Sequence, residues 1–179
     1  MVDGCQKDFR LHLNSEVSLK DFIFFNYPKR VSIDHYEKIR NDIVEYFDGN
    51  DDIISIYEYG RVKAPGVSDL DLIFVFNDKI INDAKLFSIR NVSPQAYELV
   101  MEGSVIKMNK DSFAHICYID DLRYNRLMGK DIEVFEPGLD KKKMICLVSV
   151  LDWVPERILR LINILQQNKI NISNSLTVL

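Results

Sequence analysis

The chain has 179 residues, of which 47% are hydrophobic and 28% charged, and a formal net charge of -4 at pH 7. This composition is that of one ordinary globular domain, and it excludes a disordered or collagen-like chain. The negative charge argues against a protein whose whole surface binds nucleic acid. The longest apolar run, Met144 to Leu151, is far shorter than the ~20 residues of a membrane span, so we expect none.

The cysteines point to a reducing compartment. Cys5, Cys117 and Cys146 are odd in number and show no Cys-x-x-Cys spacing. The chain does not open with a basic patch followed by an apolar run, as a secretory signal would. We therefore expect a cytoplasmic protein in which the cysteines are small buried hydrophobic residues.

The first third of the chain predicts an extension, a helix and a strand. Residues 1–30 carry apolar pieces without a sustained period, which indicates an extension that packs on the body, with one short helix from Ser18. Ser32 is a typical helix N-cap, and apolar residues follow it at a spacing near 3.6 until Gly49. The β-branched and aromatic run from Ile53 to Tyr59 predicts a strand.

The middle of the chain predicts further strands and short helices. Leu70 to Phe76 is apolar except for Asp71, which is typical of a strand buried on both faces of a sheet covered by helices. Beyond it we predict helices over 83–89 and 94–101, strands over 104–108 and 113–119, a helix over 120–127 and a short strand over 132–135.

The last part of the chain is predicted to be helical. Pro137-Gly138 indicates a break, and the helical pattern then runs from Asp140 to about Gln167. Because Pro155 falls inside this pattern, we expect two helices with a junction there rather than one rod. Basic residues outnumber acidic ones by three from Gly138 onward, and a solvated helix face is the ordinary interpretation.

These elements predict an α/β (α+β) fold, with a small mixed sheet flanked by helices and a C-terminal helical segment. The expected divisions are an N-terminal extension over 1–30, a core domain over 31–136 and the helical segment over 137–179. The chain ends on apolar residues, so we expect the helical segment to be truncated.

Two carboxylates follow a glycine-bounded loop at the start of the second strand. Because strand side chains alternate between faces, Asp69 and Asp71 point the same way. Two such like charges raise the pKa of one carboxyl unless a cation lies between them, and Mg²⁺ or Mn²⁺ suits oxygen ligands. Gly60 and Gly66 allow backbone N–H groups to approach phosphate. The pattern predicts a site for a metal-bound nucleoside triphosphate.

The run Tyr59-Gly60, followed by Ser68-Asp69-Leu70-Asp71-Leu72, resembles the signature of the nucleotidyltransferase superfamily related to DNA polymerase β, in a short-loop Gly-x(8)-Asp-x-Asp form. The resemblance covers about residues 33–135. It implies that Asp69 and Asp71 hold divalent ions that bridge the phosphates and activate an acceptor hydroxyl, and that a third carboxylate on a neighbouring strand completes the site. The nucleotide-binding residues that it implies are Gly60, Arg61, Lys63, Gly66 and Ser68.

Two residues depart from the family pattern. Arg61 replaces the serine after the glycine, although a guanidinium can also hold phosphate through its fork of donors. His115 occupies the place of the third carboxylate in the strand predicted over 113–119, and a neutral imidazole binds Mg²⁺ poorly. His115 remains a catalytic candidate, although a histidine between apolar residues is more often packed in a core. The alternatives for the missing carboxylate are Asp111, Asp120 and Glu58.

The resemblance implies a metal-dependent enzyme that moves a nucleoside monophosphate from a nucleoside triphosphate to a hydroxyl or phosphate acceptor. The acceptor would be RNA, a protein or a small molecule. The alternative is a module of the same fold that has lost catalysis and acts as a binding or regulatory partner. We also expect a helical partner or a missing C-terminal domain beside the last segment, and no membrane.

Overall fold

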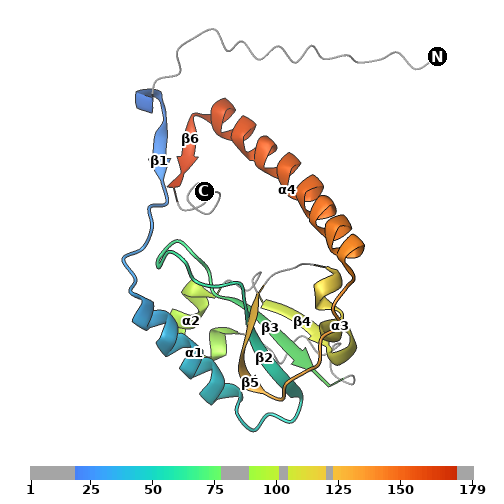
Figure 1. Cartoon of the computed structure of the whole chain (residues 1–179). Coiled ribbons are helices and arrows are strands. Elements are labelled where there is room, and N and C mark those ends of the chain that lie inside the picture. The colour runs from blue at the N-terminus through green and yellow to red at the C-terminus, as the bar shows by residue number, and fades with distance from the viewer. Residues whose placement is uncertain (1–18, 78–88, 101–104, 120–122, 173–179) are drawn as a thin grey trace, which may run out of the picture.

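A computed structural model describes residues 19–77, 89–100, 105–119 and 123–172, and its fold is mixed α/β (Figure 1). The sheet is small and mixed, helices flank it, and a long helix follows near the C-terminus, as the sequence predicts. With η for a 3-10 helix, the elements in chain order are η1 (Leu19–Asp21), β1 (Ile23–Phe25), α1 (Ile33–Phe47), β2 (Ile53–Tyr59), β3 (Asp71–Phe76), η3 (Ile89–Asn91), α2 (Pro94–Leu99), β4 (Val105–Asn109), α3 (Lys110–Ala114), η5 (Ile116–Tyr118), β5 (Tyr124–Gly129), α4 (Leu139–Gln167) and β6 (Lys169–Asn171).

The main sheet has the strand order β4-β3-β2-β5. β2 pairs antiparallel with β3 on one side and with β5 on the other, and β4 is parallel to β3. Tyr59 lies opposite Asp71, whereas Phe76 lies beside Asn109. The loop between β2 and β3 therefore lies at one end of the sheet, and the end of β4 lies at the other.

Both faces of the sheet are buried, as the apolar sequence of β3 predicts. Leu70, Leu72 and Phe74 pack on the side covered by α1 and α2. Ile73 and Val75 pack on the other side, with residues of α3 and η5. We call the unit formed by α1 to β5 the sheet body.

The first elements of the sheet body form where the sequence predicts them. α1 begins after Ser32, whose hydroxyl lies 2.8 Å from Nδ1 of His35, and its buried residues recur every three or four positions. β2 has the predicted bounds. α2 begins at Pro94 after Ser93, whose hydroxyl accepts a hydrogen bond from the N–H of Ala96 at 2.9 Å. The helix predicted over 83–89 lies mostly outside the described residues.

The strand predicted over 113–119 is wrong. The side chain of Asn109 accepts a hydrogen bond from the N–H of Ser112 at 2.7 Å, and this cap starts α3 directly after β4. Phe113, Ile116 and Cys117 are then buried on one side of α3 and η5. A short apolar run is compatible with the two-residue period of a strand and with the 3.6-residue period of a helix. Here the asparagine cap favours the helix.

Two further predictions are corrected after η5. Of the helix predicted over 120–127, residues 124–127 instead belong to β5 (Tyr124–Gly129), because pairing with β2 outweighs the weak local helical pattern. Residues 120–122 lie outside the described part of the chain. Residues 132–135 form no strand; the N–H of Phe135 instead donates to the carbonyl of Ala114 at 2.8 Å.

The junction predicted at Pro155 is also wrong, because α4 runs through it as one helix. A proline removes one backbone hydrogen bond, and the carbonyl of Leu151 that loses its donor belongs to an exposed residue, where water can bind it. The cysteine prediction holds for Cys117, which is buried, but Cys146 is exposed on α4. Cys5 lies outside the described residues.

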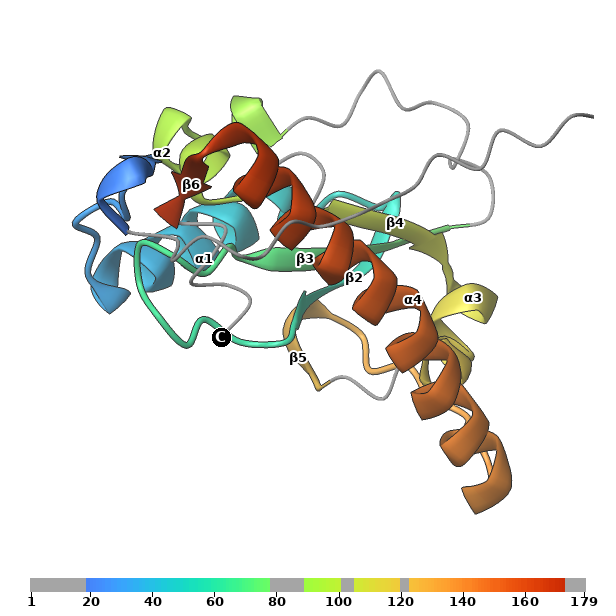
Figure 2. The same cartoon turned by 90° about the horizontal axis from the view of Figure 1, so that it is seen from above.

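α4 touches the sheet body near its start. It has no buried residue, and it contacts η5 near its start and β6 near its end. β6 pairs with β1 in a separate parallel sheet, in which Ile23 lies beside Lys169. Seen from above, α4 crosses over the sheet body (Figure 2). No helix in the described ranges is long and apolar enough to span a membrane.

Candidate functional site

The two predicted carboxylates lie where the β2–β3 loop enters the sheet. Asp71 is the first residue of β3, opposite Tyr59 of β2. Leu70 and Leu72 are fully buried on the side of α1 and α2. Because side chains alternate along an extended segment, Asp69 and Asp71 belong to the opposite side, which they share.

The surroundings of the two acids differ from those of ordinary surface carboxylates. Asp71 is half-buried and Asp69 is at the surface. The protein atoms packed around Asp69 nevertheless exclude enough water to raise the pKa of its carboxyl. A carboxylate with incomplete hydration gains more from a cation than a fully solvated one does.

The structure brings no third acid next to this pair among the residues it describes. β4, the neighbour of β3, reads Val-Ile-Lys-Met-Asn and contains no carboxylate. No three His, Cys, Asp or Glu side chains in the described ranges lie close enough together to hold a metal ion. Mg²⁺ is nevertheless often held by one or two carboxylates together with substrate phosphates, so the pair fits an ion that a nucleotide brings with it.

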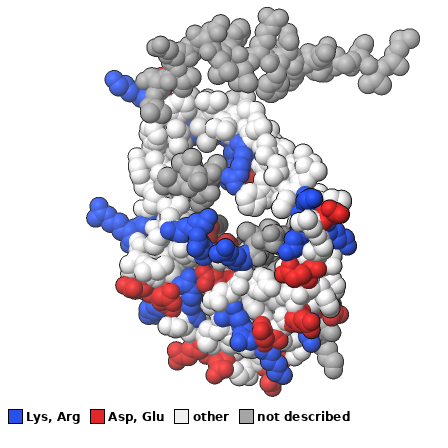
Figure 3. Space-filling model, in the orientation of Figure 1, with Lys and Arg blue, Asp and Glu red and all other residues white. Residues whose placement is uncertain are grey.

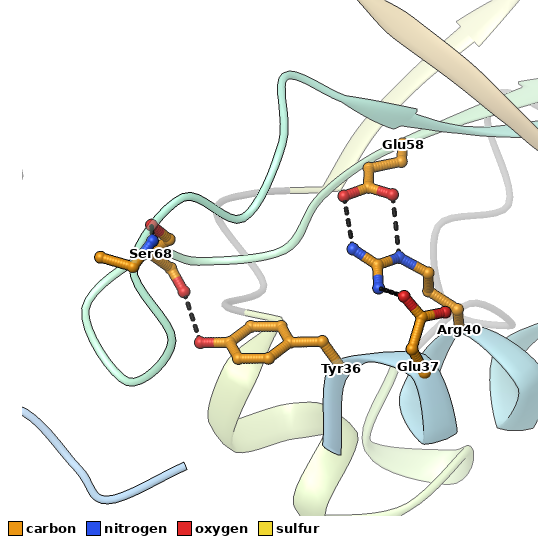
Figure 4. A network of polar contacts seen from close by, with 6 residues as sticks. Tyr36, Glu37, Arg40, Glu58 and Ser68 are labelled. Atoms are coloured by element: carbon orange, nitrogen blue, oxygen red, sulfur yellow. Dashed lines mark hydrogen bonds and ion pairs between the residues drawn. The ribbon is translucent and has the colours of Figure 1, made fainter. Parts of the chain in front are cut away.

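Glu58, an alternative for the third carboxylate, belongs to a different network. Its two oxygens accept hydrogen bonds from Nε and Nη2 of Arg40 at 2.8 and 2.7 Å, and Nη1 of Arg40 donates to Glu37 at 2.9 Å (Figure 4). Glu58 is only 6% exposed, and the hydrogen bond to Glu58 is the main reason why the pKa of Arg40 is raised. This fork ties α1 to β2, and a carboxylate held this way is not available to a metal.

His115 and Asp111 lie in the α3 region. α3 begins where β4 ends, at the opposite end of the sheet from Asp71. Nδ1 of His115 lies 2.8 Å from the carbonyl oxygen of Asp111, and the ring packs near Tyr118 and Phe135. His115 is therefore a helix-terminal residue rather than a member of a strand beside β3. Asp120, the other alternative, lies outside the described residues.

Hydrogen bonds within the β2–β3 loop and to Tyr36 and Arg123 hold the loop in place. The N–H of Gly60 donates to the carbonyl of Arg123 at 2.7 Å, and the N–H of Gly66 donates to the hydroxyl of Tyr36 at 3.0 Å. That hydroxyl in turn donates to the carbonyl of Ser68 at 2.7 Å (Figure 4). The N–H of Ala64 donates to Oγ of Ser68 at 3.1 Å. The predicted N–H donors of Gly60 and Gly66 are thus already used within the chain.

Gly66 has a packing role that the sequence does not reveal. Its φ is +83°, and a Cβ at this position would lie 2.0 Å from the carbonyl oxygen of Lys29. The N–H of Lys29 donates to the carbonyl of Gly66 at 3.3 Å. Glycine is therefore required here because another segment of the chain passes close to the loop.

Basic side chains gather over the loop, as Figure 3 shows. Arg61 and Lys63, predicted to bind the nucleotide, are both exposed on it. Two further segments approach the loop through the backbone contacts of Lys29 and Arg123. The basic rim, as we call it, consists of the exposed residues Lys29, Arg30, Arg61, Lys63 and Arg123.

Only the structure shows that three of the rim residues belong to the basic rim. Lys29, Arg30 and Arg123 lie far from the motif in the sequence, and the only local signal is the pair of basic residues before Ser32. Positive charge around the loop that leads to two carboxylates suits a metal-bound phosphate ligand.

Comparisons of the chain find no matching family model, no matching curated protein and no matching solved structure. The resemblance to the nucleotidyltransferase superfamily therefore depends on the Gly-x(8)-Asp-x-Asp motif itself.

Proposed function

We propose that this chain is a metal-dependent nucleotidyltransferase, which binds a nucleoside triphosphate and transfers its nucleoside monophosphate to a hydroxyl or phosphate acceptor. The observation that carries the proposal is the position of Asp69 and Asp71 at the start of a buried strand, directly after the loop that carries Arg61 and Lys63 of the basic rim. A site for a metal-bound triphosphate needs carboxylates that hold the metal ion and basic side chains that bind the phosphates.

In this proposal Asp69 and Asp71 hold Mg²⁺ or Mn²⁺, which supplies Lewis-acid stabilisation of phosphate charge when it is bound. Arg61 and Lys63 neutralise the phosphates with their side chains, since the N–H groups of the two loop glycines are used within the chain. Tyr36 keeps the loop in place through its hydrogen bonds with Gly66 and Ser68, so it is a positioning residue.

A second candidate function is nucleotide binding without transfer. The absence of a carboxylate from β4, together with the engagement of Glu58 by Arg40, favours it. In that case the same two aspartates hold the metal–nucleotide complex, and the chain acts as a binding or regulatory module.

One experiment separates these functions. Mn²⁺-dependent binding of ATP and the other nucleoside triphosphates is measured by calorimetry, and pyrophosphate release is measured with RNA, protein and small-molecule acceptors added. The variants are Asp69→Asn and Asp71→Asn, and the matched control is Asp111→Asn, an exposed acid on α3.

We expect Mn²⁺-dependent binding in the native chain and in Asp111→Asn, and its loss in the other two variants. Pyrophosphate release that depends on Asp69 and Asp71 supports the enzyme, and binding without release supports the module. The absence of Mn²⁺-dependent binding, or binding that survives both substitutions, would contradict both candidates.

A further inference from the structure

α4 presents an apolar surface that no described part of the chain covers. None of its 29 residues is buried. Figure 3 shows a largely uncharged surface along much of this helix. In a water-soluble chain, an exposed patch of this length usually marks an interaction site.

Seven of the exposed apolar residues of α4 form one continuous line, which we call the α4 seam. They are spaced alternately three and four apart, the repeat by which two helices pack side by side. Each is between 40% and 65% exposed, and the line extends over about 30 Å of helix. The seam consists of Met144, Leu147, Leu151, Val154, Ile158, Leu161 and Leu165.

We propose that the α4 seam binds the α4 seam of a second copy of this chain, with the two helices antiparallel. Seven side chains that are each about half exposed would bury on the order of 700 Å² per copy, close to the roughly 800 Å² per partner of a standard stable interface. The area of the seam is therefore sufficient for a dimer.

Charge selects the antiparallel arrangement. Lys141, Lys142 and Lys143 lie in the first turn and a half of α4; Lys142 pairs with Glu136 at 2.7 Å and Lys143 lies 3.7 Å from Asp140, so one positive charge is left over there. A parallel pair would place the lysines of the two copies side by side, whereas an antiparallel pair separates them by the length of the helix. The antiparallel arrangement also places opposite ends of the two helix dipoles together.

The two ends of α4 support the same arrangement. Beside its start, Tyr118 and Ile119 help to line an apolar pocket of about 230 Å³. Beside its end, Ile23 and Phe25 of β1 are exposed, at 61% and 44%. An antiparallel pair brings the start of one helix to the end of the other, so these two apolar patches of different copies approach each other.

The first test is the mass of the full chain in solution, by light scattering and sedimentation equilibrium at micromolar concentrations. Leu151→Glu and Leu161→Glu place a charge in the seam, and Asn163→Glu is the matched control on the exposed opposite side of α4. Since no described residue packs over these leucines, circular dichroism should show that all three variants keep the fold.

We expect the native chain and Asn163→Glu to be dimers, and each seam variant to raise the dissociation constant at least tenfold, because a buried charge replaces an apolar contact. A native chain that is monomeric, its seam covered by another segment of its own chain, overturns the proposal. So does a dimer that both seam variants leave unchanged.

Disulfide cross-linking tests the orientation. In the antiparallel register that we propose, Met144 lies opposite the partner's Leu161, so Met144→Cys with Leu161→Cys should cross-link in a background of Cys5→Ala and Cys146→Ala. Met144→Cys alone should not, because the two copies of that residue lie far apart. Efficient cross-linking of Met144→Cys alone would show a parallel pair and overturn the arrangement.

Discussion

α1 and α4 are both helices with an apolar stripe, but within the described residues only α1 buries its stripe against another element. α1 buries Tyr36, Ile39, Ile43 and Phe47 against the sheet, whereas α4, almost twice as long, buries nothing in the described structure. The same sequence period therefore has two meanings. In α1 the period marks residues that pack in the core of the sheet body. In α4 it marks an exposed apolar surface, which a second molecule or segment could cover.

The largest effect expected within the sheet body comes from the fork between α1 and β2. Arg40→Met leaves the buried carboxylate of Glu58 without its partner, so we expect a loss of about 3–5 kcal/mol of unfolding free energy. Chemical denaturation measures it. Glu37→Gln, which changes the exposed third member, should cost less than about 1 kcal/mol. Equal losses of unfolding free energy in the two variants would show that the buried pair of Arg40 and Glu58 stabilises the fold no more than the exposed pair of Arg40 and Glu37 does.

A pair of identical substitutions compares the two regions directly. Leu72→Ala, at a fully buried position of β3, should cost about 3 kcal/mol because it leaves a cavity. Leu159→Ala, at a position of α4 that is 62% exposed and outside the seam, should change stability by less than about 0.5 kcal/mol. The comparison fails if denaturant unfolding gives similar values for both.

The two glycines of the β2–β3 loop should also respond differently. Both have positive φ, but an added Cβ meets nothing at Gly60 and a carbonyl oxygen at Gly66. Gly60→Ala should therefore cost only the strain of a left-handed residue, about 1–2 kcal/mol. Gly66→Ala should cost more and should displace the Lys29 segment, which the amide NMR shifts of residues 29 and 30 would report. A milder effect at Gly66 than at Gly60 would contradict the close approach.

The smallest effect expected is a pH dependence at Asp69. Because desolvation raises the pKa of this carboxyl in the folded state, its charged form lowers stability at pH values above that pKa. In buffer without divalent ions, Asp69→Asn should thus have a higher Tm than the native chain at neutral pH. The difference should vanish as the pH falls through the raised pKa into the ordinary range of aspartate. A difference that persists in acid would have another cause, and Asp111→Asn serves as the control.

The parts of the fold that the sequence predicts well have strong local patterns. α1 carries an unbroken helical period, β2 is a run of β-branched and aromatic residues that ends before Gly60, and β3 is apolar after Asp71. The segment from 113 to 119 could not be assigned this way, because its few apolar residues fit either a strand or a helix. Pairing with β2 makes a strand of residues 124–129, and that partner is distant in the sequence.

In the candidate site, too, the local sequence predicts some features, whereas others depend on contacts between distant segments. Asp69 and Asp71 are adjacent in sequence, so alternation along the strand is enough to predict their common side. The engagement of Glu58 by Arg40 and the contact of Lys29 with Gly66 join segments that lie far apart in the sequence. Such contacts depend on how α1 packs on the sheet, which no local pattern contains.

The pairing of β1 with β6 has a consequence for how the molecule forms. It places Phe25 beside Asn171, and the side chain of Asn26 donates a hydrogen bond to Oδ1 of Asn171, 145 positions away in the sequence. Closing so long a loop costs on the order of 4 kcal/mol in chain entropy, and three exposed residues in β1 offer little to offset it. During synthesis this pairing must wait until residues 169–171 have left the ribosome. In the finished protein, its amide protons should exchange with solvent well before those of β2 and β3.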